Sequence, residues 1–168
     1  MMLRRLPITA RLAACTLLAT FLYLALAMHD AQAQSRSYPV DDSASQVLER
    51  LVPMEWDSTP GSGAASHAVS GTVTVLVRLD VAPWRGRPGR IYMSLPHQPS
   101  GPVTATWTTR GPLLPGVLRA GERQLVYAGP IDTALIEDTM RLHLQADGRR
   151  LGRNEQLDFS FEIEPGAL

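Results

Sequence analysis

The densest group of side chains that could bind a ligand is the run Trp84-Arg85-Gly86-Arg87-Pro88-Gly89-Arg90. Three guanidiniums and an indole within seven residues can grip an anionic sugar, a phosphate or a carboxylate, with the indole stacking on the ligand. The competing interpretation is a solvated turn between two strands, with Trp84 folded back against the core. Trp84, Arg85, Arg87 and Arg90 are therefore the candidate ligand-binding residues.

The residue patterns that catalysis and metal binding need are scarce. No Gly-x-Ser-x-Gly elbow is present, so the sequence shows no sign of an activated serine. Three histidines, His67, His97 and His143, lie after the first 33 residues, and no pair of them has the i, i+2 or i, i+4 spacing of metal ligands. His143 alternates with leucines and His97 lies between proline and glutamine, so both are expected at the surface. We expect no enzymatic activity, no metal and no cofactor.

Adjacent carboxylates occur at Glu137 and Asp138, and they diverge on any regular backbone. The paired carboxylates of glycoside hydrolases usually come from separate strands, which a sequence alone does not bring together. An exported carbohydrate-acting hydrolase with such a site therefore stays open as an alternative function.

Residues 1–33 have the pattern of a secretory signal peptide. Three arginines open the segment, residues 12–28 are an almost unbroken apolar run, and residues 31–33 read Ala-Gln-Ala, the small-x-small pattern of a cleavage site. We expect cleavage before Gln34 and no stable membrane span afterwards. An uncleaved anchor is the alternative, because the 17-residue run approaches the minimum length of a spanning helix.

Cys15 is the only cysteine of the chain. The preceding Leu-Ala-Ala resembles a lipid-attachment pattern, but the apolar run comes after the cysteine instead of before it, which argues against a lipoprotein. Removal of the leader would exclude disulfides and thiol chemistry, as suits a disulfide-free protein of a bacterial periplasm or extracellular surface.

Charge gives no sign of a nucleic-acid partner. The leader holds three of the 16 basic residues and one of the 16 acidic residues, so the rest of the chain would carry a net charge near −2. A nucleic-acid-binding domain would be expected to show a strong basic excess.

Residues 34–66 differ in composition from residues 67–168 and are expected to form an N-terminal arm and linker. Ser43 and Gln46 form a capping-box pattern that predicts a short helix. The apolar residues at one-face helical spacing are Val47, Leu48 and Leu51. So short a helix needs a surface to lean on, either its own domain or a partner. Residues 57–66 have the small-residue composition of a linker.

Residues 67–168 alternate apolar and polar side chains in short runs bounded by proline and glycine. The predicted strands are residues 69–81, 90–95, 103–108, 124–128, 140–146 and 157–164, with a seventh around residues 117–118. The last two of the six are predicted to form a hairpin across Asp147-Gly148, with Arg141 opposite Glu162.

This pattern predicts an all-β fold, an antiparallel immunoglobulin-like β-sandwich of six to seven strands with a short helical or extended N-terminal arm. A small closed barrel is the alternative. By analogy with exported sandwiches, we expect a non-catalytic cell-envelope or surface protein, acting as a binding or assembly module on an envelope protein or an anionic envelope glycan. A pilus-type subunit that assembles by strand donation is the other alternative.

Overall fold

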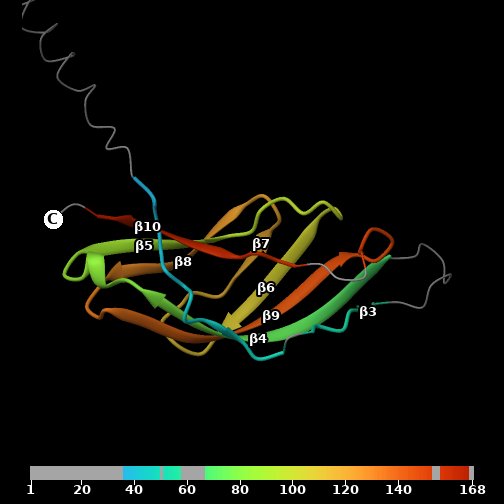
Figure 1. The fold of residues 1–168 in the computed structure, drawn as a ribbon, viewed down its shortest axis with the longest axis horizontal. Helices are drawn as coiled ribbons and strands as arrows, with labels where there is room; N and C mark the ends of the chain where they lie inside the picture. The colour runs from blue at the N-terminus through green and yellow to red at the C-terminus, as the bar shows by residue number, and fades with distance from the viewer. Residues whose placement is uncertain (1–35, 50, 58–66, 153–155, 167–168) are drawn as a thin grey trace, which may run out of the picture. The chain divides into compact units, whose positions relative to one another are not determined.

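The structure, a computed structural model, describes residues 36–49, 51–57, 67–152 and 156–166. These residues form ten strands and one 3-10 helix (Figure 1). Their bounds are β1 Tyr38–Pro39, β2 Gln46–Val47, β3 Glu55–Trp56, β4 Ala68–Asp80, η1 Ala82–Trp84, β5 Pro88–Ser94, β6 Val103–Thr109, β7 Gly116–Arg119, β8 Arg123–Pro130, β9 Leu135–Asp147 and β10 Ser160–Pro165. The predicted leader, its cleavage site and most of the predicted linker lie outside the described residues. Within the described ranges, no helix has the length and apolar character to span a membrane.

Two antiparallel sheets pack face to face. Sheet A has the strand order β1-β10-β5-β8, and sheet B has the order β2-β4-β9-β6-β7, with β3 also pairing with β4. In Figure 1 the long strands β4 and β9 lie in the lower layer, and β10, β5 and β8 lie in the upper one. The predicted all-β sandwich is confirmed, whereas its immunoglobulin-like character stays a prediction.

The alternation read from the sequence identifies the core correctly. In the main strands most of the residues that face the space between the sheets are buried. The predicted inward residues found buried include Val73, Val77, Leu79, Ile91, Met93, Leu95, Val103, Ala105, Trp107, Leu142, Phe161 and Ile163. The opposite faces of the two sheets are mainly polar, as is typical of antiparallel sheets with one face in the core, although Val117 of β7 is exposed there.

The predicted C-terminal hairpin is wrong. Strand β9 pairs with β4 and β6 in sheet B, whereas β10 pairs with β5 and β1 in sheet A. Arg141 and Glu162 therefore belong to different sheets and are not cross-strand partners. Both strands turn their apolar faces to the same core, so alternation identifies the buried face of each strand but not its partner.

The predicted helix in the N-terminal arm is also wrong, because the described arm residues, 36–49 and 51–57, form three short strands and no helix, and they lie along the edges of both sheets. The arm starts on β10, crosses from the upper to the lower layer (blue to teal in Figure 1) and continues along β4. Each of its strands has only two residues. Its conformation agrees with the extended alternative.

The arm satisfies the outer hydrogen-bonding edge of β4 along most of its length. Its contacts are the Asp41 carbonyl with Asp80 N (2.9 Å), Ser45 Oγ with Arg78 N (2.8 Å), Leu48 N with the Thr74 carbonyl (3.0 Å), Glu49 Oε2 with Thr74 N (2.8 Å) and Asp57 N with the Ala68 carbonyl (3.0 Å). An open edge of 13 residues would invite pairing with another chain, and the arm occupies it.

Gly71 lets the arm enter the sandwich. A Cβ built at this position would lie 2.8 Å from Met54 Sδ, the Pro53 carbonyl oxygen and Val52 Cγ1. Val52 and Met54 are half-buried and pack against the core. The missing side chain of Gly71 therefore opens the space that these two arm residues fill.

The turn of residues 110–115 connects β6 to β7 and is fixed by a buried carboxylate. Asp138 of β9 is 8% exposed, and its oxygens accept hydrogen bonds from the backbone N–H groups of Arg110 (3.0 Å), Gly111 (2.7 Å), Leu113 (2.8 Å) and Thr139 (2.6 Å). Burial of this charge is tolerated because several donors surround it.

The same turn links the two sheets. The buried Trp107 donates its Nε1–H to the Leu114 carbonyl (2.9 Å), and Leu114 N donates to the Val126 carbonyl on β8 (2.7 Å). A strand of sheet B is thereby connected to a strand of sheet A through one turn residue.

Candidate functional site

The arginine loop, residues 84–90, contains the end of η1 and the start of β5. Trp84 is half-buried, packs against the core, and has its ring centre 6.4 Å from that of Tyr38. Gly86 has φ +82°, a left-handed conformation that glycine adopts without strain, and its N–H donates to the Ile131 carbonyl (2.8 Å). The indole thus serves as packing, as in the competing interpretation of the loop.

The three arginines of this loop have different surroundings. Arg87 is half-buried, and its Nη2 donates to the Gly166 carbonyl (2.9 Å), while its buried Nε has no hydrogen-bond partner among the described residues. Arg90 is exposed and lies in register with Glu164 of β10, and Arg85 is exposed in the turn. One guanidinium is therefore used to hold the C-terminal segment, and two remain accessible to a ligand.

The predicted divergence of Glu137 and Asp138 is confirmed. Glu137 points outward and forms an ion pair with Arg78 (2.8 Å), whereas Asp138 points inward to the 110–115 turn. His143 and His97 are exposed, as predicted. Within the described part of the chain, no three of the histidine, cysteine, aspartate and glutamate side chains are grouped so as to hold a metal ion.

One serine, one carboxylate and one histidine come near each other beside the arm. Ser70 Oγ donates to Asp57 Oδ1 (2.5 Å), and Gln145 Nε2 donates to Asp57 Oδ2 (3.0 Å). The Ser70 hydroxyl chiefly, then Gln145 and the nearby charge of His143, hold the pKa of Asp57 below its usual value. In a catalytic triad the histidine stands between serine and carboxylate. Here the serine binds the carboxylate directly, so the group holds the arm in place.

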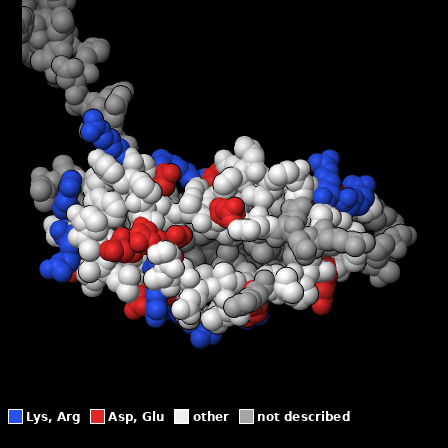
Figure 2. Space-filling view, in the orientation of Figure 1, with Lys and Arg blue, Asp and Glu red and all other residues white. Residues whose placement is uncertain are grey.

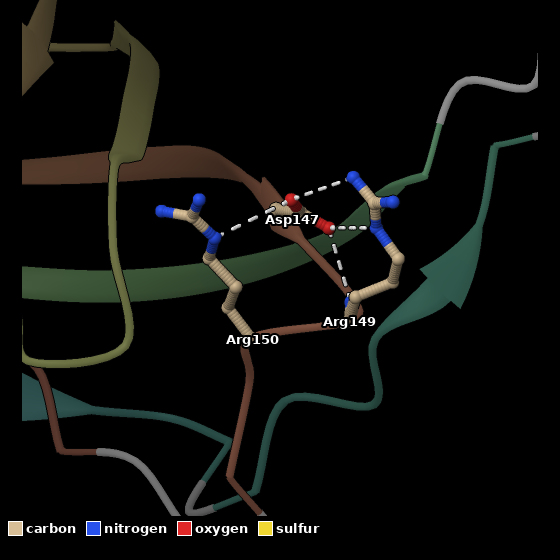
Figure 3. Close-up of polar contacts among 3 residues, drawn as sticks. All are labelled: Asp147, Arg149 and Arg150. Atoms are coloured by element: carbon tan, nitrogen blue, oxygen red, sulfur yellow. Dashed lines mark hydrogen bonds and ion pairs between the residues drawn. The ribbon is translucent and has the colours of Figure 1, made fainter.

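A second polar cluster lies where β9 ends (Figure 3). Arg149 and Arg150 approach the Asp147 carboxylate from opposite sides, with Nε to oxygen distances of 3.4 and 3.8 Å. Hydrogen bonds from the Arg149 backbone and side chain lower the pKa of Asp147. The backbone N–H of Arg149 donates to Oδ1 (3.1 Å), an arrangement typical of an Asx turn. These charges therefore stabilise the chain reversal.

The outer side of sheet B carries the largest regular group of polar side chains, which we call the threonine face. It combines the outward residues of three adjacent strands, β4, β9 and β6. Its members are Ser70, Thr72 and Thr74 on β4, Arg141, His143 and Gln145 on β9, and Thr104, Thr106 and Thr108 on β6.

Register places these residues in three rows across the sheet. The rows are Ser70–Gln145–Thr104, Thr72–His143–Thr106 and Thr74–Arg141–Thr108. Neighbouring residues are about 4.8 Å apart between strands and about 6.7 Å apart along each strand, and hydroxyls flank a central column of longer polar side chains.

The threonine face and the outer side of sheet A differ in how their polar groups are used. On sheet A, Ser94 Oγ bonds Ser160 Oγ (2.8 Å), Ser37 Oγ donates to Glu162 (2.8 Å), and Arg123 pairs with Glu164 (2.9 Å). On the threonine face, seven side chains make no hydrogen bond within the described ranges. They are Thr72, Thr74, Thr104, Thr106, Thr108, Arg141 and His143. Their donors and acceptors are left to solvent or a ligand.

An open hollow of about 370 Å³ adjoins the threonine face where β6 ends. Arg78, Arg110, Glu137 and Thr139 contribute to its lining. In Figure 2 basic side chains lie mainly toward the ends and the lower border of the view, and acidic ones lie between them.

The outward residues of each strand were predicted from the sequence, but the face they form together was not. The Thr-x-Thr repeats at residues 72–74 and 104–108 were the available signal. The sequence does not show that they belong to one surface, because this depends on the position of β9 between β4 and β6. Comparison of the chain with protein-family models, with curated proteins and with solved structures gives no match.

Proposed function

We propose that this protein is a non-catalytic, exported binding module of the cell envelope, and that the threonine face is its binding surface. The observation that supports this proposal most strongly is the contrast between the two sheets. Polar groups on sheet A bind one another, whereas on the threonine face only Ser70 and Gln145, which bind Asp57, use their side chains in hydrogen bonds among the described residues. A surface of unpaired donors and acceptors can form new hydrogen bonds without breaking old ones.

The shape of the surface favours an extended ligand. Small-molecule sites are concave and enclose most of their ligand, whereas this face is the open outer side of a sheet. The polar groups repeat along three strands, so contacts are available to a polymer lying on the sheet. Partly exposed threonine is ordinary on a strand, and the proposal depends on the regular rows and on the absence of internal bonds.

Removing hydroxyls without changing shape tests this assignment. The triple variant Thr72→Val, Thr106→Val and Thr108→Val keeps the β-branched side chains and should reduce retention of the protein on isolated cell envelopes. The matched control is Ser94→Ala with Ser160→Ala on sheet A, which should be retained like the unmodified protein. Equal retention of all three proteins would refute the assignment to the threonine face.

Export is tested separately by mass spectrometry. The Ala-Gln-Ala pattern at residues 31–33 predicts that protein recovered from the periplasm or medium begins at Gln34 and carries no lipid. A mature chain that begins at an acylated Cys15, or one that retains residues 1–33, would contradict this part of the proposal.

Assembly by strand donation is a second candidate, favoured by the short length of the three arm strands, two residues each. In this structure the arm occupies the edge of its own β4, so donation would require it to leave that edge and pair with another subunit. Sedimentation over a range of concentrations tests this candidate. A single monomeric species, even after mild denaturant has released the arm, would dismiss it.

A further inference from the structure

A track of threonines on β6 is bordered by unpaired positive charge. The strand places the hydroxyls of Thr104, Thr106 and Thr108 outward in a line, and Arg110 comes directly after the strand ends. Six residue steps at about 3.3 Å make the track from residue 104 to residue 110 about 20 Å long.

The neighbouring strands place further basic side chains on either side of this track. Arg119 of β7 lies in register with Thr104, and Arg141 of β9 lies in register with Thr108. His143 of β9 lies opposite Thr106. The track is therefore accompanied by cationic or protonatable groups on both sides and at one end.

The three arginines of this group are not paired with carboxylates of the described residues. Arg110, Arg119 and Arg141 are exposed and make no ion pair within the described ranges, whereas Arg78 on the same side of the sheet is paired with Glu137. An exposed ion pair contributes little to stability, so the fold loses little by leaving these three arginines unpaired. Their guanidiniums are therefore available to contact a ligand. These three unpaired guanidiniums belong to a chain whose formal net charge is zero.

The chemistry of the track distinguishes between polyanions. Single-stranded nucleic acid is bound mainly by stacking of bases on aromatic side chains, and the rows of the threonine face contain no aromatic residue. A glycan presents many hydroxyls, which threonine, glutamine and histidine can bind, and its acidic groups suit arginine. We propose that the threonine track binds an extended acidic glycan, a ligand class that rests on the proposed function of the face.

The test uses oligogalacturonate as the acidic probe and its fully methyl-esterified form as the neutral probe. Calorimetric titration of the exported protein should show binding of the acid and not of the ester, and binding should weaken as salt rises. The triple variant Arg110→Gln, Arg119→Gln and Arg141→Gln should bind about tenfold or more weakly, since each exposed ion pair adds a modest amount. The control variant of the arginine loop, Arg85→Gln with Arg90→Gln, changes two exposed arginines, leaves the half-buried Arg87 in place and should bind like the unmodified protein.

Each contrary result has its own meaning. Equal binding of acid and ester would overturn the acidic-glycan inference and leave the proposed binding face intact. Loss of binding in the arginine-loop variant, with binding retained in the track variant, would place the site at the arginine loop and overturn the inference. Equally tight binding of oligothymidylate would identify a general polyanion surface and contradict the choice of a glycan. Absence of oligogalacturonate binding would also overturn the inference, whereas the hydroxyl-removal experiment on envelopes decides the proposed function independently.

Discussion

Replacing Asp138 by alanine should destabilise the protein because it removes the acceptor that holds the 110–115 turn. The carboxylate accepts four backbone hydrogen bonds. Arg110 and Gly111 are exposed, so water can replace the lost acceptor there, but Leu113 is 3% exposed and Thr139 is half-buried. A buried donor left without an acceptor costs about 1 to 3 kcal/mol.

Loss of the acceptor for the N–H groups of Leu113 and Thr139 would cost about 2 to 6 kcal/mol. Part of this cost is offset because the variant no longer buries a charged group. We therefore expect Asp138→Ala to lower the free energy of unfolding by about 2 to 4 kcal/mol. The control is Glu137→Ala at the adjacent residue. Its ion pair with Arg78 has both side chains about half exposed, so its loss should cost less than about 1 kcal/mol.

Urea denaturation monitored by circular dichroism measures both variants, and amide hydrogen exchange locates the effect. Exchange at Leu113 and Gly111 should accelerate in Asp138→Ala and stay unchanged in Glu137→Ala. A loss of stability in Asp138→Ala no larger than that in Glu137→Ala would refute the role given to the buried carboxylate.

The packing and charges lead to three further predictions. In chemical denaturation, Phe161→Ala should lower the free energy of unfolding by about 3 to 5 kcal/mol, because this side chain is 6% exposed. The control Ser160→Ala, on the exposed face, should lower it by less than about 0.5 kcal/mol, and similar values for both would contradict the face assignment of β10. Gly71→Ala should displace the segment of residues 52–54, costing about 1 to 3 kcal/mol and making the arm more sensitive to limited proteolysis, whereas Thr72→Ala should leave the digestion pattern unchanged. Asp57 has a lowered pKa in the folded state, so its contribution to stability is present above its unfolded pKa of about 3.9 and disappears as pH falls through the folded value. As the pH is lowered from about 5 to about 2, the Asp57→Asn variant should therefore lose less stability than the unmodified protein. Equal losses of the free energy of unfolding in the two proteins would disprove this role of Asp57.

The buried face of nearly every main strand could be predicted because alternation is a local property. Val73 and Val77 on β4, like Ile91 and Met93 on β5, have the period of two that a sheet requires. The partner of each strand is a property of the whole chain. Two strands that share a core satisfy the same pattern whether they pair in one sheet or face each other in two, which is why the C-terminal hairpin was wrong.

Local patterns also failed where a tertiary contact replaced the expected one. Ser43 and Gln46 have the spacing of a helix cap, yet Gln46 of β2 pairs with Leu76 of β4, because the edge of β4 offers more hydrogen bonds than an isolated helical turn. Asp138 interrupts the apolar alternation of β9, so the first half of that strand was missed. Its inward carboxylate is explained only by the turn N–H groups that surround it.

The candidate binding residues divide in the same way between those that a local sequence pattern predicts and those that only the fold brings together. The arginine loop was recognisable because its charges are close together in the sequence, and the structure uses one of them, Arg87, to bind the C-terminal segment. The threonine face is assembled from strands that lie far apart in the sequence. Only the strand order brings Thr72, His143 and Thr106 into one row.

The pairing of β1 with β10 has a mechanical consequence. Tyr38 lies in register with Ile163 in an antiparallel pair, so residue 36 and residue 166 leave sheet A at the same end (Figure 1). A pulling force applied between these two positions would peel β1 away from its neighbour, loading its few hydrogen bonds one after another. Strands sheared along their length load all their bonds together and resist much larger forces. Tension through the two ends of the fold would therefore release the start of the arm long before it disturbed the threonine face.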